Sequence, residues 1–125
     1  MAVAPAQRGT FTVRPAVEAF RPDWVLVSAG YDAHRDDPLA DLAWSAGDFA
    51  DLTRRAMELA PRPGRVVAIL EGGYDLRALA RSAGATVATL GGAMYRPEAA
   101  TNGGPGREVV AATARARARL LGGLS

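Results

Sequence analysis

Two short valine-rich runs of apolar residues dominate the hydrophobic pattern of this chain. The first, WVLVSAG, spans residues 24–30, and the second, RVVAIL, spans residues 65–70. Neither run alternates with polar residues as a strand with one solvated face would. Both therefore predict strands buried on both faces, as in a parallel sheet.

Apolar residues at helical spacing predict helices before, between and after these strands. A short helix begins near Pro15 and ends before Pro22. A longer one begins after Ser45, which forms a near capping box with Asp48, and the PRPG segment at residues 61–64 stops it. The apolar stripe of that second helix consists of Phe49, Leu52, Ala56 and Leu59.

Asp75 is a good N-cap for a third helix, again a long one, which ends at Gly91 and Gly92. We expect an irregular arm over residues 1–13, a loop over 92–106 and an alanine- and arginine-rich helix over 107–125. The apolar positions of the helix after Asp75 that follow helical spacing are Leu76, Leu79, Ala83, Val87 and Leu90.

The predicted fold class is α/β: one unit over residues 1–125, with a partial, open parallel sheet and flanking helices. A crossover helix between two buried strands makes a βαβ unit. Two strands alone make a poor sheet. Either further strands lie in the irregular regions, or the chain is one part of a larger sheet.

Composition limits the chemistry that 125 residues can carry. Cysteine is absent, which excludes disulfides, thiolate zinc sites and cysteine nucleophiles. His34 is the one histidine, so one copy of the chain cannot build a metal site with two histidine ligands. The net charge of +2 is small and argues against nucleic acid as a partner. No apolar run approaches the roughly 20 residues of a membrane span, so we expect no membrane partner and a cytoplasmic location.

The polar loops after the two strands are the best candidates for a functional site. SAGYDAHRDDPL follows the first strand and EGGYDL follows the second. Ligands of open α/β sheets bind at the carboxyl ends of the strands. If the two strands pair, or have one strand between them, Asp32 and Tyr74 can face a common cleft there. A carboxylate there can hold a divalent metal, and a phenol can donate a hydrogen bond to a developing oxyanion. Gly72 and Gly73 form the turn that directs the tyrosine.

Each of these residues also has an ordinary structural interpretation. Asp32 alone would be a turn or cap residue, and Tyr74 an aromatic covering the sheet end. His34 could be a ligand or a base, but a lone histidine in a polar loop is more often exposed or bonded to backbone, and we favour that. Asp36 and Asp37, which precede a proline, are expected to fix the loop by bonding to backbone amides.

Taken together, the two motifs resemble the C-terminal part of the histone deacetylase family. VLVSAGYDAHRDDPLADL, followed about forty residues later by VVAILEGGYDLRALARS, is most similar to its class II and bacterial branch. That branch includes acetylpolyamine amidohydrolases and acetoin-utilisation proteins. The resemblance covers about residues 11–90, and the α/β fold it implies agrees with the pattern of strands and helices.

The resemblance implies a role for five residues. Asp32 corresponds to a zinc ligand, and Tyr74 to the tyrosine that polarises the acetyl carbonyl and stabilises the tetrahedral oxyanion. Leu39 corresponds to a leucine lining the tunnel for the acyl-lysine chain, and Gly72 and Gly73 to part of the tunnel wall. In the family reaction, zinc and a histidine pair activate the water that attacks the amide.

The family's His-His pair and Asp-x-His zinc ligands, which precede this region, are not in this sequence. We therefore expect a C-terminal fragment of a zinc-dependent deacetylase for acetyl-lysine or acetylpolyamine-type amides, inactive alone and not retaining zinc alone. Its partner would be a missing N-terminal half, or a further copy of itself. The alternative is a non-catalytic binding or self-assembly module that keeps the deacetylase scaffold.

Overall fold

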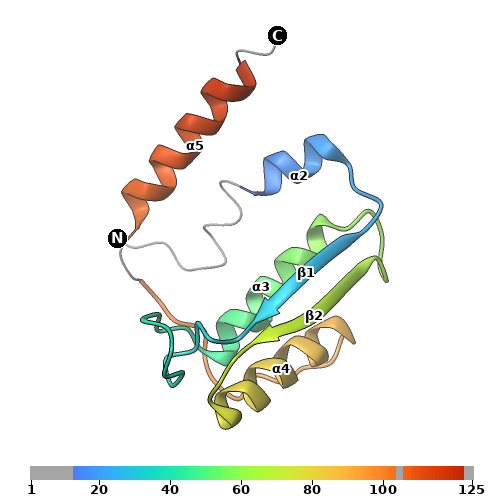
Figure 1. Cartoon of the computed structure of the whole chain (residues 1–125). Coiled ribbons are helices and arrows are strands. Elements are labelled where there is room, and N and C mark those ends of the chain that lie inside the picture. Colours follow the sequence, from blue (N-terminus) through green and yellow to red (C-terminus); the bar gives the residue numbers. More distant parts are fainter. Residues whose placement is uncertain (1–12, 104–105, 123–125) are drawn as a thin grey trace.

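A computed structural model of the chain describes residues 13–103 and 106–122, so the predicted irregular arm lies outside the described residues except for Val13. The predicted order of helices and strands is confirmed (Figure 1). The elements in chain order are α2 (Arg14–Phe20), β1 (Val25–Gly30), α3 (Ala46–Leu59), β2 (Val66–Gly72), α4 (Leu76–Leu90) and α5 (Arg107–Gly122).

The two strands run parallel, as the sequence predicts, and the structure shows that they pair directly with each other. Their register runs from Val25 opposite Val66 to Gly30 opposite Gly72, with an irregularity just before Gly30. β2 continues to Gly72, two residues beyond the predicted end. The reason is that Gly72 still takes part in the ladder: its carbonyl accepts the backbone N–H of Tyr31 at 2.9 Å.

Helices α3 and α4 pack against each other on one face of this sheet (Figure 1). Small side chains allow the close approach, because Ala46, Ala50 and Ala85 form the buried cluster between them. The apolar stripe predicted for α4 is only partly buried: Leu79, Ala83 and Leu90 are half-buried, whereas Leu76 is 79% exposed and Val87 is 67% exposed. The buried residues of α4 are instead Ala78, Ser82, Ala85 and Thr86.

The opposite face of the sheet is uncovered by the described residues and is apolar except at its carboxyl end, where Ser28 Oγ donates to Glu71 Oε1 at 2.9 Å. Leu26 of β1 is 69% exposed, and Val67 and Ile69 of β2 are also exposed. These side chains alternate along each strand with inward-facing residues that are half-buried. The expectation of strands buried on both faces is therefore wrong for the described residues, although the residue types remain those of a doubly buried sheet.

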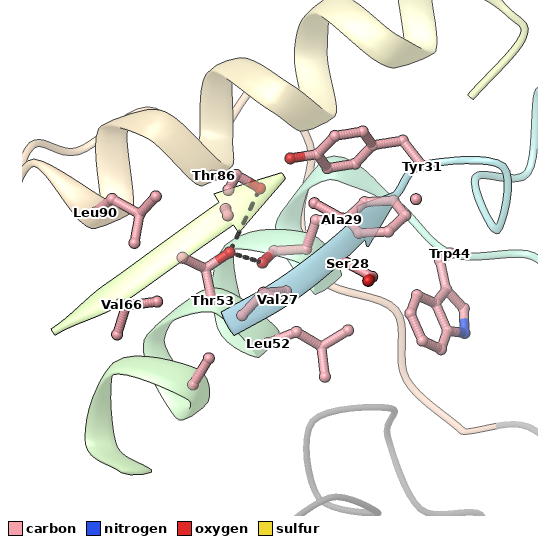
Figure 2. Close-up of a pocket in the computed structure, with 14 residues that line it drawn as sticks. Val27, Ser28, Ala29, Tyr31, Trp44, Leu52, Thr53, Val66, Thr86 and Leu90 are labelled. Atoms are coloured by element: carbon pink, nitrogen blue, oxygen red, sulfur yellow. Dashed lines mark hydrogen bonds between the residues drawn. The ribbon is translucent and has the colours of Figure 1, made fainter. Parts of the chain in front are cut away.

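The helix-covered face is incompletely filled. A cavity of about 180 Å³ lies between the sheet and the two helices, with Val27 of β1 and Leu52 of α3 in its wall (Figure 2). Its lining is mostly apolar, with a few hydroxyl groups. Of these, Thr53 Oγ1 donates to the carbonyl of Phe49 at 2.7 Å and lies 3.4 Å from Thr86 Oγ1.

Two sets of hydrogen bonds hold the N-terminus of α3: a capping box within the helix, and bonds to a distant segment of the chain. Ser45 and Asp48 form the capping box that the sequence predicts, each side chain accepting the other residue's backbone N–H. The segment 96–101, called the strap here, crosses this helix end. Ser45 Oγ donates to the carbonyl of Ala99 at 2.6 Å, and the N–H of Thr101 donates to Asp48 Oδ1 at 3.0 Å.

The last helix, α5, lies apart from the sheet (Figure 1). It begins at Arg107, as predicted from its alanine and arginine pattern. Within residues 13–103 and 106–122, no helix has both the length and the apolar character needed to cross a membrane.

Candidate functional site at the carboxyl edge of the sheet

The loops that follow β1 and β2 leave the sheet at the same edge, because the strands are parallel and paired. Asp32 comes two residues after the end of β1, and Tyr74 two residues after the end of β2. The structure thus brings the predicted site residues to one edge of the sheet.

The Asp32 carboxylate lies against the last residue of each strand. A Cβ atom added to Gly30 would lie 2.9 Å from Asp32 Oδ1, and one added to Gly72 would lie 3.4 Å from the same oxygen. The side chain is half-buried, and no residue in the described part of the chain donates a hydrogen bond to its carboxylate. Asp32 therefore keeps its oxygen lone pairs available for a ligand.

Asp37 joins the loop after β1 to the turn after β2. Its Oδ1 accepts the N–H of Leu39 at 2.9 Å, and its Oδ2 accepts the N–H of Tyr74 at 2.7 Å. Burial raises the pKa of Asp37, but the hydrogen bonds from the backbone of Tyr74, Leu39 and Asp75, with the nearby His34, hold it below its ordinary value. The carboxylate is therefore ionised at neutral pH.

Tyr74 and Leu39 themselves point largely to solvent. The Tyr74 side chain is 59% exposed and that of Leu39 is 69% exposed. Gly73, between β2 and Tyr74, has a φ of +123°, and a Cβ there would lie 3.1 Å from Tyr31 Cβ. A glycine is therefore needed at the turn that precedes the tyrosine, as the sequence suggests.

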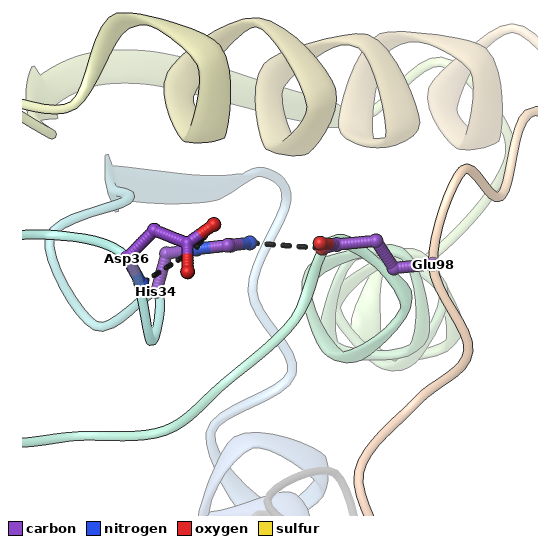
Figure 3. A group of neighbouring side chains, drawn as sticks. All are labelled: His34, Asp36 and Glu98. Carbon is purple, nitrogen blue, oxygen red and sulfur yellow. Dashed lines mark hydrogen bonds and ion pairs between the residues drawn. The ribbon is translucent and has the colours of Figure 1, made fainter.

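His34 is fully buried and bonded through both ring nitrogens (Figure 3). Its Nδ1 accepts the backbone N–H of Asp36 at 3.1 Å, and its Nε2 lies 2.8 Å from Glu98 Oε2. Because Nδ1 is an acceptor, we assign the ring proton to Nε2, which donates to Glu98. The expectation that His34 is exposed or bonded to backbone is confirmed by its bond to the Asp36 backbone, although the side chain is buried and not exposed.

Glu98 of the strap links His34 to α3. Besides the His34 ring, its Oε2 accepts the backbone N–H of Ala46 at 2.7 Å, while its Oε1 lies 3.4 Å from Arg35 and from Arg81. Burial raises the pKa of Glu98, but the Ala46 N–H, the His34 ring and the Arg81 charge hold it below its ordinary value. The sequence carries no local signal for this residue, because its partners are at least 17 residues away, His34 being 64 away.

His34, Asp36 and Glu98 lie close enough together for a metal ion to be considered, with candidate ligand atoms within 4.8 Å of one another. Both ring nitrogens of His34 are already engaged in hydrogen bonds, and Asp36 Oδ2 accepts from Arg81 at 2.9 Å. This cluster is therefore a hydrogen-bonded support for the loop. Among the described residues no backbone amide donates to the Asp36 side chain, so that expectation is wrong there, whereas the same expectation for Asp37 is confirmed.

Comparison with known proteins gives a consistent picture. Residues 8–90 match the histone deacetylase domain. A probable deacetylase of Methanothermobacter thermautotrophicus is 45% identical over 93 residues, which are 74% of this chain and 27% of that protein. "Histone deacetylase 10, chloroplastic" of Oryza sativa is 50% identical over 72 residues, 56% of this chain and 16% of that protein. In the crystal structure of the HDA15 HD domain, a similar fold covers 96% of this chain and 34% of that chain, with a TM-score of 0.77 and 30% identity.

The chain belongs to the histone deacetylase family. It is a partial domain of that family: it spans roughly a sixth to a quarter of the curated relatives named above, and about a third of the HDA15 domain chain. Its α/β architecture, with a two-stranded parallel sheet and flanking helices, matches part of the deacetylase fold.

The family is typically zinc-dependent, so the donor atoms at the sheet edge can be compared with what zinc requires. Asp32 offers a half-buried carboxylate without a hydrogen-bond donor. The Asp37 carboxylate already accepts hydrogen bonds from three backbone N–H groups. Both ring nitrogens of His34 are hydrogen-bonded, one to the backbone of Asp36 and one to Glu98. A catalytic zinc site uses three protein ligands. The described residues at this edge therefore fit one ligand of such a site and not a complete site.

Proposed function

We propose that this chain is the C-terminal portion of a zinc-dependent deacetylase of the class II and bacterial branch. Its substrates would be acetyl-lysine or acetylpolyamine-type amides. The observation that carries the proposal is that Asp32 and Tyr74 follow directly paired parallel strands and so share one edge of the sheet. In a site assembled there, Asp32 is a zinc ligand, Tyr74 is catalytic, and Leu39, Gly72 and Gly73 line the acyl channel.

The chemistry of this chain's own residues follows from their types and positions. Zinc, when bound in a complete site, supplies Lewis-acid activation of water and of the amide carbonyl. The Tyr74 phenol donates a hydrogen bond to the carbonyl oxygen as that oxygen becomes negatively charged, which stabilises the tetrahedral oxyanion. The exposed Leu39 side chain presents an apolar surface to the methylene groups of the acylated amine.

The chain alone would lack activity, because a single carboxylate holds zinc weakly and the histidine pair that acts as acid and base in the family precedes the matching region. The missing part would be supplied by the N-terminal portion of a deacetylase domain. Support comes from the uncovered apolar face of Leu26, Val67 and Ile69, since parallel sheets are covered on both faces. The apolar cavity between the sheet and the two helices is a second place for side chains of that portion (Figure 2).

The second candidate function is a non-catalytic binding or self-assembly module that keeps the scaffold. The same uncovered sheet face favours it, because free strand edges and exposed apolar side chains promote association between copies. The two candidates differ in what covers that face. Light scattering over a range of concentrations that shows a stable oligomer of the chain alone would favour the module.

The proposal is tested by measuring deacetylation of an acetyl-lysine reporter with zinc present. The chain is assayed alone, then with the N-terminal portion of the Methanothermobacter relative, which is supplied as a separate polypeptide and as a fusion. We expect no turnover by the chain alone, and turnover on assembly that Tyr74→Phe abolishes. Tyr95→Phe is the matched control, because the Tyr95 ring lies beside Gly84 of α4. Turnover by the chain alone that Tyr74→Phe abolishes would refute the claim that the site is incomplete.

A further inference from the structure

Asp37 connects two functional loops that lie far apart in the sequence. Its side chain is 93% buried, and its two oxygens accept the N–H groups of Leu39 at 2.9 Å, Tyr74 at 2.7 Å and Asp75 at 3.4 Å. The bond to Leu39 closes a local turn. The bond to Tyr74 spans 37 residues and reaches across the edge of the sheet. A local turn alone would not require this second bond.

Tyr74 has few other restraints. Its side chain is 59% exposed, and no hydrogen bond to its phenol occurs among the residues that the structure describes. Before it stands Gly73, whose φ of +123° is open to other conformations because glycine has no Cβ. After it stands Asp75, whose Oδ1 accepts the N–H of Ala78 at 2.8 Å and begins α4. The backbone of Tyr74 is thus fixed on one side by a helix cap and on the other by Asp37.

Leu39 is restrained in the same way. Its side chain is 69% exposed, so packing does not fix it, whereas its backbone N–H donates to Oδ1 of Asp37. One rigid carboxylate therefore holds the backbone of Leu39 with one oxygen and that of Tyr74 with the other. Hydrogen bonds to an ionised acceptor are shorter and stronger than those between neutral groups.

We propose that Asp37 is a positioning residue that sets the separation between the Tyr74 phenol and the acyl-contacting Leu39. This rests on the proposed function, in which those two residues contact the same substrate. Asp37 touches neither substrate nor metal in this proposal. It acts through the backbone of the two residues that do, and a small displacement of a catalytic group has a large effect on rate.

The first experiment measures backbone amide hydrogen exchange by NMR on the full chain. Asp37→Asn removes the charge and replaces one acceptor oxygen by an amide NH₂, which cannot accept a hydrogen bond. We expect exchange at Tyr74, at Leu39 or at both to rise about tenfold or more, in keeping with the loss of a charged hydrogen bond. Amides in the middle of α3 and α4 should keep their rates. Asp36→Asn is the matched control, because Asp36 is half-exposed and bonds Arg81 instead.

Two exchange results would overturn the proposal: unchanged exchange at both Tyr74 and Leu39 in Asp37→Asn, or a uniform rise across α3 and α4, which indicates a merely structural role. If Asp37→Asn does not fold, amide exchange in the unmodified chain tests the proposal instead. Its Tyr74 amide must then be protected to a degree similar to amides inside α4, and an unprotected Tyr74 amide contradicts the proposal.

The second experiment measures kcat and KM of the fusion with the N-terminal portion. Asp37→Asn should lower kcat about 10- to 100-fold with bound zinc unchanged, whereas Asp36→Asn should leave kcat near that of the parent fusion. An unchanged kcat in Asp37→Asn overturns the positioning role. If the parent fusion has no activity, the proposed function fails, and the exchange result alone then decides whether Asp37 holds the two loops.

Discussion

Gly30 and Gly72 face each other at the carboxyl ends of β1 and β2, and the Asp32 carboxylate occupies the space beside both. Because Gly30 has no side chain, Asp32 Oδ1 can lie beside it, only 2.9 Å from the position that a Cβ atom on residue 30 would occupy. A single small residue at the strand end thus determines where the candidate zinc ligand lies.

Gly30→Ala is predicted to displace Asp32 without unfolding the chain. The added Cβ meets only the end of a flexible side chain, so the free energy of unfolding from urea titration should change by less than about 1 kcal/mol. The affinity of the assembled fusion for zinc should fall at least about tenfold, because the substitution displaces a zinc ligand.

Gly72→Ala is the matched control for this substitution, because its Cβ would lie 3.4 Å from the same oxygen, an ordinary contact distance. We expect it to bind zinc within a few-fold of the parent. Equal zinc affinities for Gly30→Ala and the parent would contradict the placement of Asp32 in the metal site.

Gly47→Ala is predicted to destabilise the chain by about 1–3 kcal/mol in urea unfolding, as overpacking does. A Cβ at Gly47 would lie 2.6 Å from the carbonyl oxygen of Glu98, where the strap crosses α3. This neighbour is backbone, so relief requires the strap to move. Gly91→Ala, whose Cβ would come no closer than 3.4 Å to Val87 O, should be near neutral. Equal stabilities of the two variants would show that the strap does not pack on α3 as described.

Glu98→Gln is predicted to destabilise the chain by about 1.5–3 kcal/mol at neutral pH, because it weakens charged hydrogen bonds from His34 and Ala46. The folded-state pKa of Glu98 is below its ordinary value. Its contribution is therefore fully present above the unfolded pKa of about 4.3 and is lost as the pH falls through the folded pKa.

The measurement for Glu98 is urea unfolding of parent and variant from pH 7 down to about pH 3. The difference in unfolding free energy should shrink as the solution is acidified below about pH 4.3. A difference that stays constant over this range would mean that the carboxylate charge of Glu98 does not stabilise the fold.

Much of the fold follows from local signals in the sequence. The capping box of Ser45 and Asp48, the N-cap at Asp75 and the glycine stop at Gly91 each depend on residues within a few positions, and each is observed. The parallel direction of the strands follows from their composition and from the helix between them, whereas their direct pairing is seen only in the structure. The positions of Asp32 and Tyr74 at one edge then follow from the parallel direction of the strands.

The missed features depend on contacts between distant segments. Burial of His34 requires Glu98, which lies 64 residues away on the strap. The buried face of α4 is chosen by the close approach of α3, so small residues such as Ala78 and Ala85 are inside while Leu76 is exposed. Hydrophobicity alone predicts the reverse, because no local pattern encodes the distance between two helices.

The zinc content of the assembled domain is the decisive measurement of whether Asp32 is a metal ligand. Zinc is measured by atomic absorption after equilibrium dialysis of the chain alone, of the fusion with the N-terminal portion and of the fusion carrying Asp32→Asn. We expect no retained zinc for the chain alone, one zinc per fusion and a large loss of zinc with Asp32→Asn. One zinc retained by the chain alone, or a fusion whose zinc is unaffected by Asp32→Asn, would contradict the claim that this partial domain contributes Asp32 to a shared metal site.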